Sequence, residues 1–152
     1  MRKLVLMAAI ASSVITTVAM ATTTMGDFYC PAPSKIELVP DGNGTYVYEA
    51  IIGEKLFKQP EVYAEKSDQS IPLTFRSAAV FAPNKGTFGK MVCGYNFVNH
   101  LINGVGLWLP ENYRVHPDLT VSGNNWRRGN KNGHVKAYCF SNSVTSCPAY
   151  LR

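Results

Sequence analysis

The sequence lacks the patterns that would mark a hydrolase or a metal site. It has no G-x-S-x-G nucleophile motif and no H-E-x-x-H zinc motif. Its three histidines, His100, His116 and His134, are too widely spaced to place two ligands on one face of a helix or strand. The closest cysteines have seven residues between them, whereas zinc ligands usually come in close pairs. We therefore predict no catalytic residue, no metal site and no cofactor; a small hydrolase without a motif is the less favoured alternative.

Long apolar runs are absent after residue 21. Met1-Arg2-Lys3 precedes an uncharged segment over 4–18, and Ala19-Met20-Ala21 then places small residues where a signal peptidase cleaves. A membrane anchor is the alternative, but the apolar run contains Ser and Thr and is shorter than the roughly 20 residues of a spanning helix. We predict a signal peptide over 1–21 and one secreted or periplasmic domain over 22–152, without a transmembrane span.

Amphipathic segments long enough for a substantial helix are also missing. Short runs of alternating polarity are instead separated by turn residues about every ten positions. The strongest hairpin joins 71–81 to 90–98, and Asp41-Gly42-Asn43-Gly44 predicts a tight turn. The pattern predicts an all-β fold, an antiparallel sandwich or barrel of about seven short strands. The other expected strands are 35–39, 45–52, 53–58, 105–109 and 134–140, with loops over 60–69, 110–118 and 122–133.

Alternation also predicts which side chains of the hairpin share a face. In 71–81 we expect Phe75, Ala79 and Phe81 to point the same way as Ile71 and Leu73. In the strand that follows, Met91, Cys93, Tyr95 and Phe97 should share a face.

Four cysteines, an even number in an exported chain, predict two disulfides that stabilise the fold. Three connectivities are possible, and the sequence does not decide among them. We favour Cys30–Cys93 with Cys139–Cys147, which would join the N-terminus to the sheet and close a local loop. The pairing Cys93–Cys139 with Cys30–Cys147 stays open, because Cys93 and Cys139 both fall on apolar strand faces.

Acidic residues are scarce in the C-terminal half. Residues 76–152 contain nine Lys or Arg but only Glu111 and Asp118, a net charge of +7, whereas residues 22–75 carry −4. The whole chain is +5, and loss of Arg2 and Lys3 with the signal peptide leaves +3. Such asymmetry attracts anions to one side of a molecule, unless the two halves interleave in space and their fields cancel.

The densest basic segment lies in and just after the expected loop 122–133. Arginine side chains match the oxygens of phosphate and carboxylate groups, and an exposed tryptophan suits a lipid headgroup region or a sugar face. The segment predicts an anionic lipid headgroup or an acidic glycan as partner, peripheral membrane contact in the first case, and no nucleic acid. The alternative is a solvated loop whose tryptophan folds back onto the core. The predicted binding residues are Trp126, Arg127, Arg128, Lys131 and Lys136.

A second candidate surface centres on the other tryptophan. If Val105, Leu107 and Leu109 face the core, Trp108 faces outward beside small glycine neighbours. It would then form a stacking platform for a carbohydrate or for a host or envelope protein. The alternative is a closed two-sheet core in which both faces of this strand are buried. The residues predicted for this surface are Trp108, Tyr113 and Arg114.

Short motifs surround the cysteines over most of the mature chain. They are Cys30-Pro31, Ser34, Ile36, Cys93, Tyr95, Asn125-Trp126, Cys139, Ser141 and Cys147-Pro148. The pattern resembles a family of small exported bacterial proteins of unknown function with a signal peptide and four spaced cysteines. The resemblance implies a periplasmic or secreted bacterial protein and assigns no catalytic residue.

These patterns together predict an exported, non-enzymatic binding protein that recognises an anionic surface. A protein-binding module, such as an inhibitor or an adhesin, is the alternative. The two hypotheses use different surfaces, the basic segment around Arg127 and the sheet face around Trp108.

Overall fold

The computed structural model describes residues 28–42, 44–60, 71–81, 89–98, 104–117, 125–129 and 134–151. The segment predicted as a signal peptide, 1–21, lies outside these residues. Within the described part of the chain, no helix is long and apolar enough to cross a membrane.

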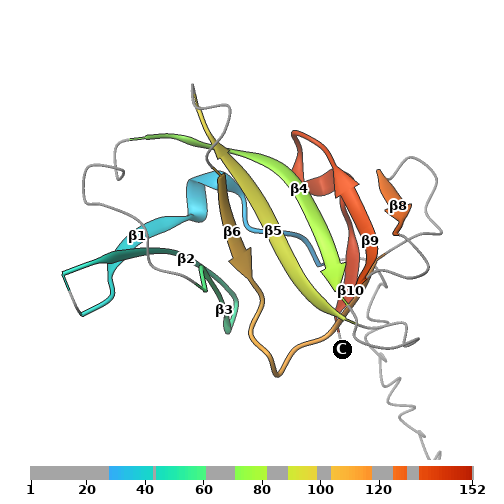
Figure 1. Cartoon of the computed structure of the whole chain (residues 1–152), viewed down its shortest axis with the longest axis horizontal. Coiled ribbons are helices and arrows are strands. Elements are labelled where there is room, and N and C mark those ends of the chain that lie inside the picture. The colour runs from blue at the N-terminus through green and yellow to red at the C-terminus, as the bar shows by residue number, and fades with distance from the viewer. Residues whose placement is uncertain are drawn as a thin grey trace, which may run out of the picture.

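Eight strands form one antiparallel sheet in the order β1-β2-β3-β6-β5-β4-β9-β8, and β10 pairs with β7 in a second, two-stranded sheet (Figure 1). This arrangement confirms the predicted all-β class. The strands of the large sheet are β1 (Glu37–Pro40), β2 (Tyr46–Ile52), β3 (Lys55–Lys58), β4 (Leu73–Phe81), β5 (Lys90–Phe97), β6 (Gly104–Trp108), β8 (Trp126–Arg128) and β9 (Val135–Phe140); those of the small sheet are β7 (Val115–Pro117) and β10 (Ala149–Leu151). Two short 3-10 turns, η1 (Pro33–Lys35) and η3 (Val144–Ser146), complete the described elements.

The two hairpins with the clearest turn chemistry form as predicted. β4 pairs with β5 along almost its whole length, and β1 pairs with β2 across the glycine-rich turn. Gly42 and Gly44 in that turn have φ of 86° and 75°, a left-handed conformation that glycine adopts without steric cost.

Three short strands lie where none was expected. β7 and β8 fall inside segments predicted to be loops, and β10 follows the strand predicted to be the last one. Each has only three residues, too few for alternation to be visible in the sequence. These three strands can therefore be recognised only from their pairing with other strands in the folded structure.

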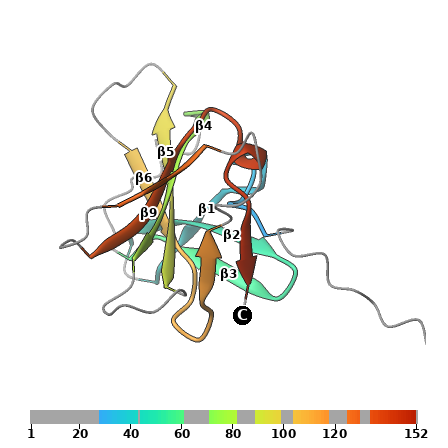
Figure 2. The same cartoon turned by 90° about the vertical axis from the view of Figure 1, so that its right-hand side faces the viewer.

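Strands β1, β2 and β3 turn away from the other five strands of the sheet (Figures 1 and 2). The bend lies between β3 and β6, which are joined by one paired position, Lys58 with Trp108. The β7–β10 sheet lies behind the plane of β4, β5, β6 and β9, and Phe28 extends it by bridging to Ala149. We call the side of the large sheet that faces this layer its inner face, and the opposite side its outer face.

The hydrophobic core fills the space between the inner face and the covering layer. Phe28 of the covering segment stacks on Phe57 of β3 at 5.9 Å between ring centroids. Tyr95 and Phe75, neighbours across β5 and β4, meet edge to face at 5.7 Å. Burial of these rings and the aliphatic chains between them is the main favourable contribution to folding.

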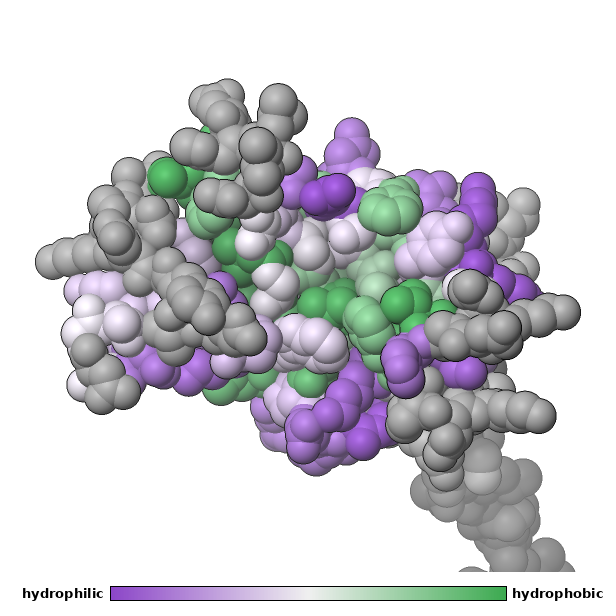
Figure 3. All heavy atoms as spheres, viewed as in Figure 1, coloured by the Kyte–Doolittle hydropathy of each residue, from purple (hydrophilic) through white to green (hydrophobic). Residues whose placement is uncertain are grey.

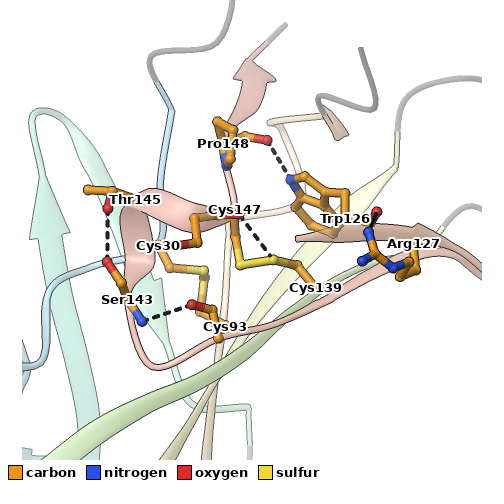
Figure 4. Close-up of a disulfide and its surroundings, with 11 residues drawn as sticks. Cys30, Cys93, Trp126, Arg127, Cys139, Ser143, Thr145, Cys147 and Pro148 are labelled. Carbon is orange, nitrogen blue, oxygen red and sulfur yellow. Dashed lines mark hydrogen bonds between the residues drawn. A yellow bond between two sulfur atoms is a disulfide. The ribbon is translucent and has the colours of Figure 1, made fainter. Parts of the chain in front are cut away.

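Both disulfides join the covering segments to one cross-strand row of the inner face (Figure 4). Cys30 bonds to Cys93 and Cys139 bonds to Cys147, which confirms the favoured pairing. Cys93 and Cys139 are both register partners of Ala78, one on each side of β4. The chain before β1 and the chain after β9 are thus fixed to adjacent points of the same sheet. Two disulfides also indicate an oxidising, exported environment.

The predicted face of β4 is wrong beyond Phe75. A β-bulge interrupts the pairing with β5 between Phe75 and Ser77, and the extra residue shifts the alternation by one position. Phe75 is buried as expected, but Ala78 and Val80 then point inward. Ala79 and Phe81 consequently lie on the outer face, where they become available to a surface site.

One buried polar contact fixes the N-terminal segment beside its disulfide. The hydroxyl of Tyr95 donates a hydrogen bond of 2.7 Å to the carbonyl oxygen of Pro31, next to Cys30. Burial raises the pKa of Tyr95 well above its ordinary value. The buried phenol therefore ionises less readily than an exposed one, which preserves this hydrogen bond as the pH rises.

We expect the two disulfides to contribute unequally to stability. Replacing Cys30 and Cys93 by Ala should lower the free energy of unfolding by about 4 kcal/mol, against about 2.5 kcal/mol for Cys139 and Cys147, because a closed loop of 63 residues restricts the unfolded chain more than one of 8. Urea unfolding of the two double variants measures both values. Equal losses, or a larger loss for the short loop, would contradict this account.

A Tyr95→Phe variant should change how stability depends on pH. The unfolded tyrosine ionises near pH 10, whereas burial raises the pKa of the folded one above that value, so its contribution to stability is complete below pH 10 and is lost as the pH rises further. The variant should be about 1–3 kcal/mol less stable at pH 7 through loss of the bond to Pro31, yet lose less stability between pH 10 and 11. Parallel alkaline curves for the two proteins would show that Tyr95 is not the responsible group.

Candidate functional site

Trp126 is part of the core and not an exposed anchor. Its side chain is 3 % exposed, and its indole N–H donates a 2.6 Å hydrogen bond to the carbonyl oxygen of Pro148 (Figure 4). The reason is register: β8 aligns Trp126 with Cys139, whose side chain faces inward. The buried indole matches the alternative in which the tryptophan folds back onto the core, and it is not exposed as an anchor in a lipid or glycan surface would have to be.

Of the other residues in the predicted basic site, the two arginines that the structure describes point to opposite faces. Arg127 and Arg128 are both exposed, but successive strand residues point to opposite faces. Arg127 pairs with the outward-facing Tyr138, and Arg128 with the inward-facing Ala137. Lys131 lies outside the described residues. Lys136 is half-buried beside a β-bulge between β9 and β4.

The side chain of Arg127 also covers part of the unpaired edge of the large sheet. Its Nη1 donates a 3.0 Å hydrogen bond to the carbonyl oxygen of Trp126, in β8, the edge strand of the large sheet. A charged side chain over an edge carbonyl discourages pairing with a strand of another chain. The guanidinium group is held at the outer face, and it has donors beyond the one it uses here.

Trp108 points outward, as its alternation with three apolar neighbours predicts. Val105, Leu107 and Leu109 are buried, whereas Trp108 is half-buried and stacks on Phe81 with ring centroids 5.4 Å apart. Phe81 reaches this position because of the bulge in β4. The pair forms an aromatic cluster on the outer face.

Tyr113 and Arg114 belong to a separate turn. Tyr113 packs against the core, and the Nζ of Lys55 lies 5.3 Å from the centre of its ring. Arg114 donates hydrogen bonds from Nη1 to the carbonyl oxygens of Glu111 and Tyr113. These contacts hold the chain between β6 and β7 in place, so both side chains have a structural role.

A row of register partners crosses the outer face, and we call it the outer strip. It runs through neighbouring strands from β8 to β3: Arg127, Tyr138, Ala79, Val92, Trp108 and Lys58. Aromatic rings stand near both ends, with the small side chains of β4 and β5 between them. Tyr138 and Trp108 are three strands apart, a distance of about 14 Å.

The second aromatic cluster stands at the β9 end of the outer strip. Tyr138 is 36 % exposed and Phe140 is 60 % exposed, and their rings tilt against each other at 5.5 Å. In Figure 3 apolar side chains gather across the middle of this face, over β4, β5 and β6, with hydrophilic side chains around them. Alternation placed Tyr138 outward, but only the strand order brings it into one row with Trp108.

The charged residues of the five strands on this side of the bend are all basic. Strands β4, β5, β6, β8 and β9 contain no Asp or Glu. Their five basic residues are Arg76, Lys90, Arg127, Arg128 and Lys136. One of these charges is compensated from outside the strands: Lys90 forms an ion pair with Glu111, whose pKa is lowered by this hydrogen bond and by the charge of Lys90. The acidic residues of the described strands, Glu37 and Glu49, lie beyond the bend, on β1 and β2.

Polar side chains flank the outer strip on one side. Arg76 is exposed and donates a 3.5 Å hydrogen bond to the side-chain oxygen of Asn96. Thr74, the register partner of Asn96, is also exposed, and Ser77 lies across from Gly94. Hydroxyl, amide and guanidinium groups are thus within the same face as the aromatic clusters.

A hollow of about 610 Å³ opens beside Trp108, where β3 and β6 diverge. Its lining is largely apolar and includes Leu56, Pro60, Leu109 and Pro110. Lys58 stands at its rim and forms a 3.0 Å ion pair with Asp41. The hollow lies next to Trp108 and Lys58, at the β3 end of the outer strip.

No protein-family model, curated protein or solved structure matches the chain. The resemblance to small exported four-cysteine proteins thus stays a prediction. Among the residues that the structure describes, no group of three or more His, Cys, Asp or Glu side chains is placed to hold a metal ion.

The two tryptophans should differ sharply in solvent access. With Trp108 replaced by Phe, the emission of Trp126 should lie near that of a buried indole and resist quenching by acrylamide, because Trp126 is 3 % exposed. With Trp126 replaced by Phe, the emission of Trp108 should lie at longer wavelength and be quenched several-fold more strongly. Equal quenching of the two single-tryptophan proteins would contradict the placement of β8.

Proposed function

We propose that this protein is an exported, non-enzymatic binding protein that recognises an anionic ligand on the outer face of its large sheet. The ligand-binding residues are Arg76, Arg127, Trp108 and Tyr138, in place of the loop site expected from the sequence. The observation that carries the proposal is the charge of five strands beneath this face, which contain no acidic residue. Of their basic residues, Arg76 and Arg127 are exposed on the outer face, whereas Arg128 points to the other face. Aromatic rings at both ends of the outer strip add apolar contact area.

Selection of an anion follows from the uncompensated charges. Among the described residues, the guanidinium group of Arg76 hydrogen-bonds to a neutral amide and that of Arg127 to a backbone carbonyl, and neither is in an ion pair. Neither bond neutralises a guanidinium charge. An incoming carboxylate, sulfate or phosphate would supply the missing counter-charge and accept two parallel hydrogen bonds from one guanidinium group.

Export supports the same proposal. Two disulfides fit an oxidising compartment, and the N-terminal sequence has the three parts of a signal peptide. A secreted or periplasmic protein with this face would meet the anionic polymers and surfaces of a cell envelope. The proposal requires no catalytic group.

Polyphosphate, an anionic polymer without rings, tests the charge of the face. The oxidised protein should bind it at low salt and release it near 1 M salt, where the screening length falls to about 3 Å. Arg127→Ala and Arg76→Ala should each weaken binding about 1.4- to fivefold, since one exposed charge pair contributes about 0.2–1 kcal/mol. Isothermal titration calorimetry at several salt concentrations gives these affinities.

Arg128→Ala is the matched control for this experiment. It removes the same charge from the neighbouring residue of β8, which points to the other face. It should weaken binding clearly less than Arg127→Ala. Equal effects of all three substitutions would mean that only net charge matters and that the outer face is not a binding site.

A further inference from the structure

We infer that the ligand of the outer strip is an acidic glycan, a chain of sugar rings that bear carboxylate or sulfate groups. The inference rests on the proposed function and assigns its ligand class. It depends on four features of the outer face: the spacing of the rings, the flat track between them, the position of the arginines and the polar groups beside the track.

The aromatic clusters are suited to stacking with sugar rings. The C–H groups on one face of a pyranose ring pack against the electron-rich face of an indole or phenol. Trp108 with Phe81 and Tyr138 with Phe140 offer two such clusters. Trp108 and Tyr138 themselves are about 14 Å apart across three strand spacings, and Phe81 belongs to β4, which lies between them. Two clusters at this separation require a ligand that extends across the strands, as an oligosaccharide does.

The part of the outer strip between the two aromatic clusters, which we call the track, has only short side chains. Ala79 and Val92 are the only side chains of the outer strip between Tyr138 and Trp108. On one side of them lie Gly94 and Gly106, which expose backbone and no side chain. A chain of sugar rings can therefore lie against β4 and β5 and touch both clusters at once.

The arginines are placed to pair with charges along such a chain. Arg127 is the direct cross-strand neighbour of Tyr138, so a sugar stacked on the phenol brings its acidic group near the guanidinium. Arg76 lies on the same side of β4, bonded to Asn96. The strands under the track contain no carboxylate that would repel an acidic sugar.

Hydroxyl and amide groups beside the track distinguish a glycan from a lipid surface. Thr74, Ser77 and Asn96 can exchange hydrogen bonds with sugar hydroxyls. Binding to a bilayer instead needs an apolar face that enters the headgroup region by about 5–10 Å, and here the polar groups share the face with the rings. The hollow beside Trp108, about 610 Å³, would take a sugar residue at the end of the chain.

The test measures the affinity of the oxidised protein for four probes by isothermal titration calorimetry. They are a hexuronate oligosaccharide, a neutral hexose oligosaccharide of the same length, polyphosphate, and vesicles that contain phosphatidylglycerol.

The hexuronate should bind at least about tenfold more tightly than the neutral oligosaccharide. Trp108→Ala and Tyr138→Ala should each weaken hexuronate binding about two- to tenfold, and should weaken polyphosphate binding clearly less, because polyphosphate has no ring to stack on them. Tyr138→Phe, which keeps the ring, should retain most of the affinity.

Tyr150→Ala is the control for loss of an aromatic ring, since Tyr150 lies in β10, in the covering layer, and stacks on His116. It should leave hexuronate binding unchanged, and urea unfolding shows whether each variant is folded. Equal binding of hexuronate and polyphosphate with no effect of the ring variants would overturn the glycan inference and leave anion binding intact. Binding to vesicles without binding to oligosaccharides would overturn it in favour of a lipid surface. If no probe binds, both the inference and the proposed function fail.

Discussion

The structure depends on the row of the inner face in which Cys139 and Cys93 flank Ala78. Each cysteine of this row holds one of the two segments that cover the core, through Cys147 and Cys30. The hydrogen bonds from Tyr95 to Pro31 and from Trp126 to Pro148 act beside the same two disulfides. Without these attachments, the backbone bridge between Gly89 and Val115 of β7 would remain to join the covering layer to the large sheet, because the β7–β10 pairing and the bridge at Phe28 lie within that layer.

Covering one face leaves the other face free for function. The outer face carries half-exposed rings and basic groups on the same strands whose inner residues form the core. Because the strands are paired over a rigid core, the positions of Arg127, Tyr138 and Trp108 are set by the sheet register and not by loop conformation. A surface of this kind presents its groups without a large entropic cost on binding, which suits the recognition of a long, weakly structured anionic chain.

The bend between β3 and β6 separates two electrostatic regions. On one side of it, β1, β2 and β3 carry Glu37 and Glu49 together with Lys55 and Lys58; on the other side, β4, β5, β6, β8 and β9 carry five basic residues and no acidic one. The charge asymmetry of the two halves of the chain thus survives folding within the described strands, because strand order keeps β1, β2 and β3 together at one end of the sheet. An anion near the outer strip meets mainly positive charge.

The sequence by itself determined the all-β class, the β4–β5 and β1–β2 hairpins and the outward direction of Trp108, because alternation and turn chemistry are local properties. It favoured the observed cysteine pairing without deciding it, since pairing depends on which strands become neighbours. The tertiary structure alone decided the rest. Three-residue strands have no visible period, so the sequence predicts a loop at β8 and leaves open whether Trp126 is exposed or folds onto the core. A single bulge in β4 reversed the faces of Ala79 and Phe81, and the outer strip exists only because strand order aligns residues from six separate segments. Register and strand order are set by long-range packing, which local sequence patterns do not encode.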